Sequence, residues 1–280
     1  MLVFRSTPGL DPATLLFAIG ALGLLLALIS FSAARALPDQ RMGLREWGRA
    51  MLAASGGFLL QFLRGHAPWE LTFLLANLLV MMVPAFVLLA HARLLEQPAR
   101  PCVVWGLYAV GVSGVLASYW LGAPLSVPIF TMAGIVAVLL AMTALRILQH
   151  QRRHPHSTTQ FAAMIILATA LFFAVRAGMA LFGDGAAVRP AAQAPQQIGM
   201  LLVGALFLVA ATIGFFSMVH ERQRRELLER ARRDGLTGLY TRSAFMELAQ
   251  AVTRPGQAAS HAVAMIDIDH FKQVNDRYGH

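Results

Sequence analysis

The chain has 280 residues, enough for one or two ordinary domains, but 57% of its residues are hydrophobic and only 13% are charged. Soluble domains carry roughly 25% charged residues, so this composition excludes a wholly soluble protein and predicts one largely embedded in a membrane. The net charge of +9 reflects 23 basic residues, of which all but Lys272 are arginine. Basic loops beside apolar runs follow from membrane orientation alone, so we expect membrane lipid, and no nucleic acid, as their partner.

Seven apolar runs are long enough to cross the hydrocarbon core as helices, which requires about 20 residues each. The second run is the weakest, because only 14 residues separate Arg49 from Arg64 and they include two glycines. Both arginines can still extend their side chains to the membrane surface. We therefore predict an α-helical integral membrane bundle of about seven spans over residues 1–219, with spans at 13–34, 47–64, 70–91, 102–121, 127–148, 159–182 and 197–219.

The arginines are divided unevenly between alternate connections of these runs. One set of connections holds nine, namely Arg35, Arg41, Arg45, Arg49, Arg93, Arg100, Arg146, Arg152 and Arg153. The opposite set, with the N-terminal tail, holds three, namely Arg5, Arg64 and Arg189. Positively charged loops are retained in the cytoplasm, so we expect the N-terminus outside and the C-terminal segment inside. A cleaved signal peptide over residues 1–34 is the competing interpretation, but it would export the loop that holds the first four of the nine arginines.

Residues 220–233 change abruptly to charged helix formers without glycine or proline. Glu221/Arg225, Glu226/Arg230 and Glu229/Arg233 are spaced i,i+4, and each such pair stabilises a helix by about 0.2–0.5 kcal/mol. We predict that the last span continues into the cytoplasm as a signalling helix. Leu227 and Leu228 give only a thin apolar stripe, so a dimeric coiled coil and a solvated coupling helix both remain open.

From Asp234 onward the pattern is that of a soluble domain. An apolar stripe at i, i+3, i+4 and i+7 predicts an amphipathic helix, and its residues are Phe245, Leu248, Ala249 and Val252. The apolar run 262–268 predicts a buried strand, and a short helix follows to Tyr278. This alternation indicates an α/β domain. The 47 residues from 234 to 280 are fewer than even a marginal domain of about 60 residues needs, so we expect the domain to be incomplete at His280.

Two carboxylates end the predicted strand, at Asp267 and Asp269, with Lys272 close behind. Residues at i and i+2 lie on one face of a strand. Carboxylates at a strand end beside a lysine are the oxygen ligands that hold Mg²⁺ against a polyphosphate. The alternative is a helix cap followed by a solvated side chain, and the spacing alone does not separate the two.

Residues 234–280 resemble the start of the GGDEF domain of diguanylate cyclases. The opening Asp234-Gly-Leu-Thr-Gly-Leu239 matches the family pattern D-x-L-T-G-L, and Arg242 with Phe245 matches the N-R-x-x-F that follows it. The segment from Asp267 to His280 matches D-I-D-x-F-K-x-x-N-D-x-Y-G-H. Thr241 departs from the pattern, because the family usually has Asn there.

The resemblance implies a nucleotidyl cyclase-like fold and the condensation of two GTP into cyclic di-GMP and pyrophosphate by a homodimer. By position, Asp267 and the Ile268 carbonyl are implied ligands of Mg²⁺ or Mn²⁺, with Asp269 as a further contributor. Lys272 is implied at the phosphates, Asn275 at the guanine edge, and Phe271 among the substrate-binding residues. The protein would then sit in a bacterial inner membrane. The GGDEF hairpin with its second metal carboxylate is expected after His280, so the printed chain by itself is expected to be inactive.

The membrane region is expected to sense an unknown ligand. Asn77 and Arg176 lie within predicted spans and are candidates for ligand contact. The simpler interpretation is a helix–helix hydrogen bond for Asn77 and an arginine reaching the surface for Arg176. Two other functions compete with a cyclase, namely an inactive GGDEF protein that acts as a nucleotide receptor or scaffold, and a transporter. No charged pair at mid-membrane and no repeat supports the transporter.

Overall fold

The computed structural model describes residues 11–37, 42–153, 157–182, 195–252 and 269–279, together with residues 262, 264 and 266. The chain divides into two compact units, Met1–Glu221 and Arg222–His280. The division falls within two residues of the boundary at 219/220 that the change in composition predicts.

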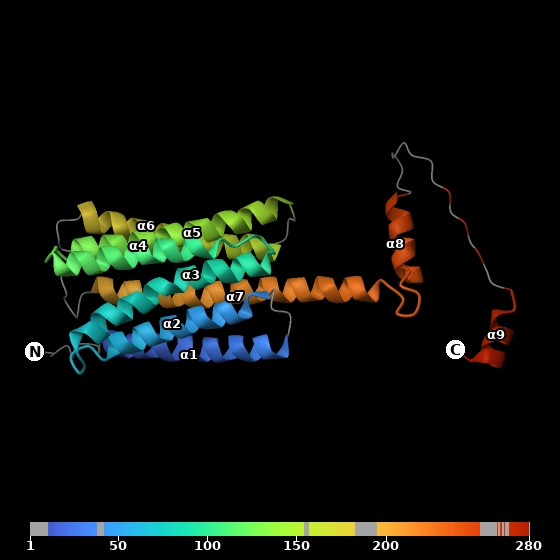
Figure 1. The fold of residues 1–280 in the computed structure, drawn as a ribbon, viewed down its shortest axis with the longest axis horizontal. Helices are drawn as coiled ribbons and strands as arrows, with labels where there is room; N and C mark the ends of the chain where they lie inside the picture. Colours follow the sequence, from blue (N-terminus) through green and yellow to red (C-terminus); the bar gives the residue numbers. More distant parts are fainter. Residues whose placement is uncertain are drawn as a thin grey trace, which may run out of the picture. The chain divides into compact units, whose positions relative to one another are not determined.

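The first unit is a bundle of long helices whose sequence neighbours run in opposite directions (Figure 1). Because the direction alternates, the C-terminal ends of α1, α3 and α5 lie at the end where α7 leaves the bundle. The helices are α1 Pro12–Ala36, α2 Leu44–Phe62, α3 Ala76–Leu94 with the preceding π-helix η2 Glu70–Leu75, α4 Pro101–Trp120, α5 Ser126–Arg153, α6 Ser157–Phe182 and α7 Pro195–Ala231.

Within the described ranges, six helices are long and apolar enough to cross a membrane: α1, α3 together with η2, α4, α5, α6 and α7. Helix α2 is present but is not one of them, because Arg45, Glu46 and Arg49 lie in its first turns. It packs along both α1 and α3 and buries ten of its 19 residues. A seventh span at α2 therefore stays a prediction, and burial against other helices explains how α2 tolerates these charges.

Close contacts at two glycines show why α2 can pack so tightly. Gly43 precedes α2 with φ of +68°, and a Cβ there would collide with the backbone carbonyl of Ala90. A left-handed conformation is accessible to glycine without steric penalty. On α1, a Cβ at Gly23 would lie 3.2 Å from the backbone nitrogen of Ser55, and the Ser55 hydroxyl donates to the carbonyl of Gly20 at 2.7 Å. The backbones of α1 and α2 thus approach too closely for larger side chains.

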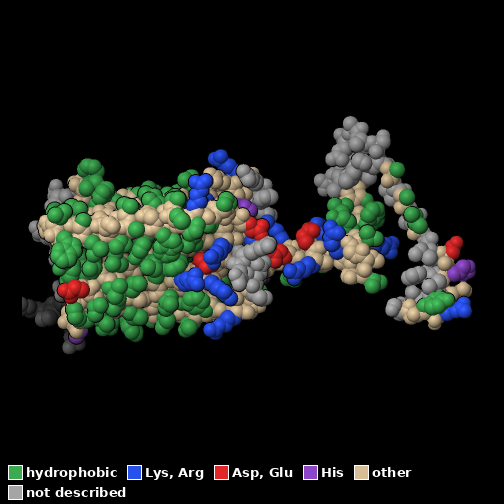
Figure 2. All heavy atoms as spheres, viewed as in Figure 1, with side chains coloured by type: hydrophobic (Ala, Val, Ile, Leu, Met, Phe, Trp, Pro, Cys, Tyr) green, Lys and Arg blue, Asp and Glu red, His purple; other side chains and the backbone are tan. Residues whose placement is uncertain are grey.

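Arginine side chains gather at the end of the bundle where α7 leaves it, as Figure 2 shows. This arginine-rich end is defined by Arg35, Arg45, Arg49, Arg93, Arg100, Arg146 and Arg152, which flank the connections after α1, α3 and α5. The opposite end has Arg64 among the residues that the structure places. Arg5, Arg41 and Arg189 lie outside the described residues, as does the side chain of Arg153. The alternating helices therefore bring the arginine-rich connections to one end.

We expect the arginine-rich end to face the cytoplasm, because positively charged connections are retained on that side. Reporter fusions in living cells measure on which side of the membrane each connection lies. A cytoplasm-active reporter should give signal after Thr158, and a periplasm-active reporter should give signal in the connection 183–194. The reverse pattern at these two sites would contradict the orientation.

The second unit begins within α7, which continues as a helix to Ala231. The helix is unbroken over these residues, as the sequence predicts, and two charge pairs that the sequence analysis did not name lie along it. Arg222 pairs with Glu226 at 3.0 Å, and Glu229 pairs with Arg232, one residue before the predicted Arg233. An i,i+3 pair is as compatible with helix geometry as an i,i+4 pair.

Helices α8 Arg242–Val252 and α9 Phe271–Tyr278 match the two short helices that the sequence predicts. The predicted strand over 262–268 is not seen at the described residues 262, 264 and 266, which have no regular structure and are exposed. A strand needs a partner for its backbone groups, and no strand occurs elsewhere in the described ranges. The α/β architecture of this domain therefore stays a prediction.

Candidate functional site

A compact turn joins the end of α7 to the start of α8 and is organised by Asp234. One carboxylate oxygen of Asp234 accepts from the backbone N–H of Leu236 at 3.1 Å and from that of Thr237 at 2.9 Å. The same oxygen accepts from the Thr237 hydroxyl at 2.9 Å. Asp and Asn side chains commonly stabilise turns in this way. The aspartate that opens the D-x-L-T-G-L pattern is thus the anchor of the turn.

The two sides of the turn are joined by backbone hydrogen bonds. The N–H of Asp234 donates to the carbonyl of Leu239, and the N–H of Thr241 donates to that of Arg232, both at 2.8 Å. Gly238 has φ of +69°, where glycine is strongly favoured. The guanidinium of Arg233 donates to the Gly238 carbonyl at 3.0 Å and lies 5.0 Å from the centre of the Tyr240 ring.

Thr241 caps the first turn of α8. Its carbonyl accepts from the N–H of Phe245 at 2.9 Å, and its hydroxyl lies 3.3 Å from that of Ser243. Threonine and asparagine both serve well as N-cap residues. The departure from the usual Asn is therefore compatible with the start of a helix at this position.

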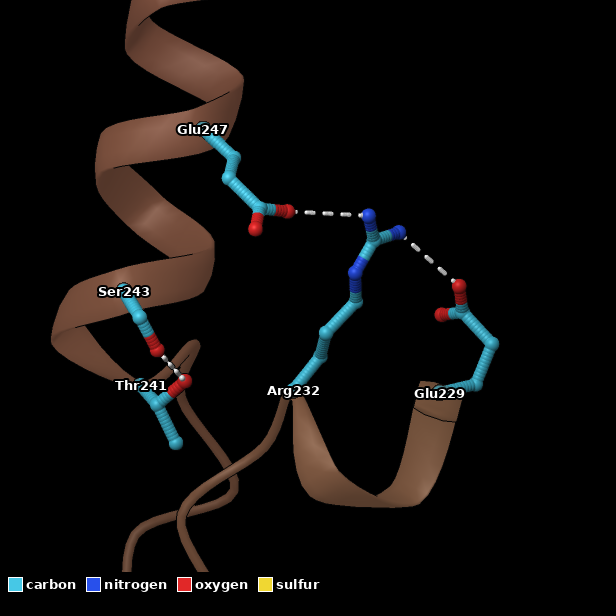
Figure 3. A network of polar contacts seen from close by, with 5 residues as sticks. All are labelled: Glu229, Arg232, Thr241, Ser243 and Glu247. Carbon is cyan, nitrogen blue, oxygen red and sulfur yellow. Dashed lines mark hydrogen bonds and ion pairs between the residues drawn. The ribbon is translucent and has the colours of Figure 1, made fainter. Parts of the chain in front are cut away.

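Arg232 connects the end of α7 to α8 (Figure 3). Its guanidinium pairs with Glu229 at 3.0 Å and with Glu247 at 3.1 Å. The hydrogen bond that Arg232 donates to Glu247, followed by the charge of Glu229, raises the pKa of Arg232 above its ordinary value. The sequence analysis missed this residue. The spacing to Glu229 could have indicated one pair, but Glu247 is 15 residues away, and only the folded turn brings it near.

The hydrogen bonds at Asp234 predict a pH response of the turn. Donation by the Thr237 N–H and hydroxyl, and then by the Leu236 N–H, lowers the pKa of Asp234 below its ordinary value of about 3.9. Because the pKa of Asp234 is lower in the folded turn than in the unfolded chain, ionised Asp234 contributes its full stabilisation of the turn above the unfolded pKa. That stabilisation is lost as the pH falls through the folded pKa. We expect hydrogen–deuterium protection factors of residues 236–237 to stay constant from pH 7 to about 4 and to fall below it. Asp234→Asn should abolish this dependence of the protection factors on pH. An equal fall in protection in the Asp234→Asn variant would contradict the assignment to Asp234.

The described residues of the predicted metal and substrate site lie in the turn before α9 and on that helix. Asp269 is exposed in this turn, where His270 has φ of +60° and its carbonyl accepts from the N–H of Gln273 at 2.9 Å. Lys272 is exposed on α9, and Asn275 follows three residues later. Residues at i and i+3 are one helical turn apart, which is the spacing of Lys272 and Asn275 along α9.

Asp267 and Ile268 lie outside the described residues, and so do the side chains of Phe271 and Asn275. Within the described ranges, no group of three His, Cys, Asp or Glu side chains could hold a metal ion. The predicted donor set consists of carboxylate and carbonyl oxygens, and its described member, Asp269, is exposed to solvent. Oxygen donors of this kind suit Mg²⁺, so the residues fit the metal that the resemblance implies.

Comparison with known proteins identifies this part of the chain. Residues 209–280 match the family described as diguanylate cyclase, GGDEF domain. These residues belong to the GGDEF family. The resemblance seen in the two motifs is therefore confirmed, and the GGDEF match begins upstream of the turn, within α7.

Three curated relatives of the GGDEF segment come from different bacteria. An uncharacterized signaling protein of Caulobacter vibrioides is 46% identical over 65 residues, which are 21% of this chain and 8% of the relative. The uncharacterized protein YhcK of Bacillus subtilis is 44% identical over 50 residues, 17% of this chain and 14% of the relative. An uncharacterized 19.3 kDa protein of Streptomyces ambofaciens is 46% identical over 54 residues, 19% and 28% of the two chains. The chain thus spans under a third of each relative, and no solved structure matches it.

The two candidate sensory residues each contact another residue of the helical bundle. The Asn77 side chain donates to the carbonyl of Phe73, one turn earlier in the same helical segment, at 2.8 Å, so the predicted helix–helix bond is not the one observed. The guanidinium of Arg176 on α6 contacts the sulfur of Met200 on α7. Neither contact indicates a particular ligand.

Proposed function

We propose that this protein is a membrane-anchored diguanylate cyclase that condenses two GTP into cyclic di-GMP and pyrophosphate. The observation that carries the proposal is the GGDEF match over residues 209–280, which begins in an apolar helix long enough to span a membrane. The turn anchored by Asp234 supports it, because the family's opening pattern forms a structured connection to α8.

The proposed site combines a metal-binding strand end with a polar helix face. Asp267, the Ile268 carbonyl and Asp269 would hold Mg²⁺ or Mn²⁺, which when bound supplies positive charge to the phosphates. Lys272 would bind the phosphates from the start of α9. Asn275, one turn later, would hydrogen-bond the guanine edge, and Phe271 would line the same site. Catalysis then consists of positioning and charge neutralisation.

The proposed arrangement is a homodimer in a bacterial inner membrane, with two half-sites facing one another. GTP is cytoplasmic, so the GGDEF domain must lie there, in agreement with the arginine-rich end at which α7 leaves the bundle. The membrane bundle would receive an unidentified signal.

The direct test is nucleotide chromatography of the protein expressed from its own gene to the natural stop codon and purified in detergent. With GTP and saturating Mg²⁺, we expect cyclic di-GMP and pyrophosphate, and no product when Mg²⁺ is removed by a chelator. A folded protein that binds GTP without converting it would overturn the proposal in favour of a nucleotide receptor.

A further inference from the structure

Helix α7 is most deeply buried in the bundle near the point where it leaves. Over its described side chains from 198 to 211, every residue is at least partly exposed. Burial begins at Thr212 and continues at Phe215, Met218 and Val219, spaced as one helix face. Among the six candidate spans, α7 has the smallest buried share, 17% against 39% for α3 and α5. Its attachment to the other helices is therefore concentrated just before His220.

Phe215 forms the centre of this attachment. Its ring is fully buried and stacks on Trp47 of α2, with ring centres 4.3 Å apart and planes 7° apart. His91 of α3 meets the edge of the stack, 5.3 Å from Phe215 and 5.7 Å from Trp47. Stacked and edge-to-face aromatic pairs are favourable beyond the area that they bury. We call this arrangement of Trp47, His91 and Phe215 the α7 seat.

The two helices that form the seat are joined to each other by a buried charge. The Glu46 side chain on α2 is 3% exposed and pairs with Arg93 of α3 and, at 3.3 Å, with Arg49. Buried charges are tolerated only when they are paired. His91 is fixed in turn, because its Nδ1 lies 2.9 Å from the carbonyl of Val87. Trp47 and His91, which contact α7, thus lie on two helices that an ion pair joins.

We infer that α2 and α3 set the position of α7 through the seat, and that this contact passes the state of the membrane bundle to the output helix. Phe215 would act as a pivot. A shift of α2 against α3 would move the rings of Trp47 and His91, and Phe215 would follow because it stacks on Trp47 and contacts His91 edge to face. The α7 helix continues from Phe215 to Ala231, so a rotation at the seat is a rotation of the signalling helix. The inference rests on the proposed function only where cyclic di-GMP yield is measured.

Thiol labelling of the protein in native membranes tests the seat directly. The background carries Cys102→Ser, which removes the one cysteine of residues 1–280, and Val219→Cys, a buried position of α7 four residues after Phe215. We expect Phe215→Ala to increase maleimide labelling at position 219 several-fold. Trp47→Ala, on α2, should also increase labelling at position 219. Trp47→Phe keeps an aromatic ring to stack on Phe215, so its labelling should be as slow as that of the protein with only the two cysteine substitutions.

Trp105→Ala is the matched control, because the ring contacts of Trp105 on α4 within the described residues are with Phe86 and Tyr108, neither of which belongs to α7. It removes an equally large ring and should leave labelling at position 219 unchanged. Size-exclusion chromatography in detergent identifies any variant that fails to fold. If Phe215→Ala does not fold, Phe215→Leu replaces it, and its maleimide labelling at position 219 should rise by an intermediate amount. Unchanged labelling in both seat variants, or an equal increase in Trp105→Ala, would overturn the inference.

The same variants show whether the seat controls the output. In the protein expressed to its natural stop codon, Phe215→Ala and Trp47→Ala should shift cyclic di-GMP yield per folded molecule in the same direction, and Trp105→Ala should not. Faster labelling with unchanged yield would overturn the role in transmission. If the wild type makes no product, the proposed function fails, while the labelling rates still decide whether α2 sets the position of α7.

Discussion

Asp267→Asn should abolish cyclic di-GMP synthesis while leaving the fold intact. Asp267 follows an apolar run and stands where the matched GGDEF pattern implies a metal carboxylate. Asparagine has nearly the same size but lacks the charge, so a metal ion would lose its main ligand. The effect is expected to be a loss of all measurable turnover, because phosphoryl transfer depends on neutralising phosphate charge.

The measurement is nucleotide chromatography at saturating Mg²⁺, with folding checked by size-exclusion chromatography. Asn275→Ala is the matched variant at the base-recognition position. It should weaken the use of GTP, raising KM, while Mg²⁺ binding measured by calorimetry stays largely unchanged. Wild-type turnover by Asp267→Asn would eliminate the metal assignment.

Breaking the signalling helix should have the second large effect, the uncoupling of output from the membrane bundle. Leu227→Gly with Leu228→Pro introduces a proline into the interior of α7, at a cost of about 3 kcal/mol or more to the helix. Leu227 and Leu228 are 64% and 53% exposed. The double variant therefore breaks the helix without opening a cavity in the described packing.

The readout is cyclic di-GMP yield in membranes, compared between the full protein and a version without residues 1–219. With an intact helix the two should differ, and with the Gly-Pro break the difference should disappear. The control, Leu227→Ala with Leu228→Ala, keeps helix propensity and removes only the apolar stripe. Loss of regulation in this control too would favour a coiled-coil contact between two copies, whereas unchanged regulation in the Gly-Pro variant would make the helix a passive tether.

The largest contributions to this protein's architecture are visible in its sequence. Apolar runs of membrane length, the abrupt change at His220 and the periodicity of 242–252 predict helices that the structure contains at nearly the same bounds. These are local properties, since helix formation depends on residues three and four apart. The family motifs at Asp234 and Asp267 likewise lie in single stretches of chain, so the sequence was sufficient to indicate the GGDEF family.

The tertiary structure decided which side chains from distant segments meet. Arg232 pairs with Glu247 only because the turn at Asp234 brings α8 back toward α7. Phe215 was one of many apolar residues in the last span, and only the packing of α2 and α3 against α7 makes it the pivot of the seat. Helix α2, marginal as a membrane span from its composition, is largely buried between its neighbours. Periodicity along one helix shows which face is apolar, but it contains no information about which helix that face contacts.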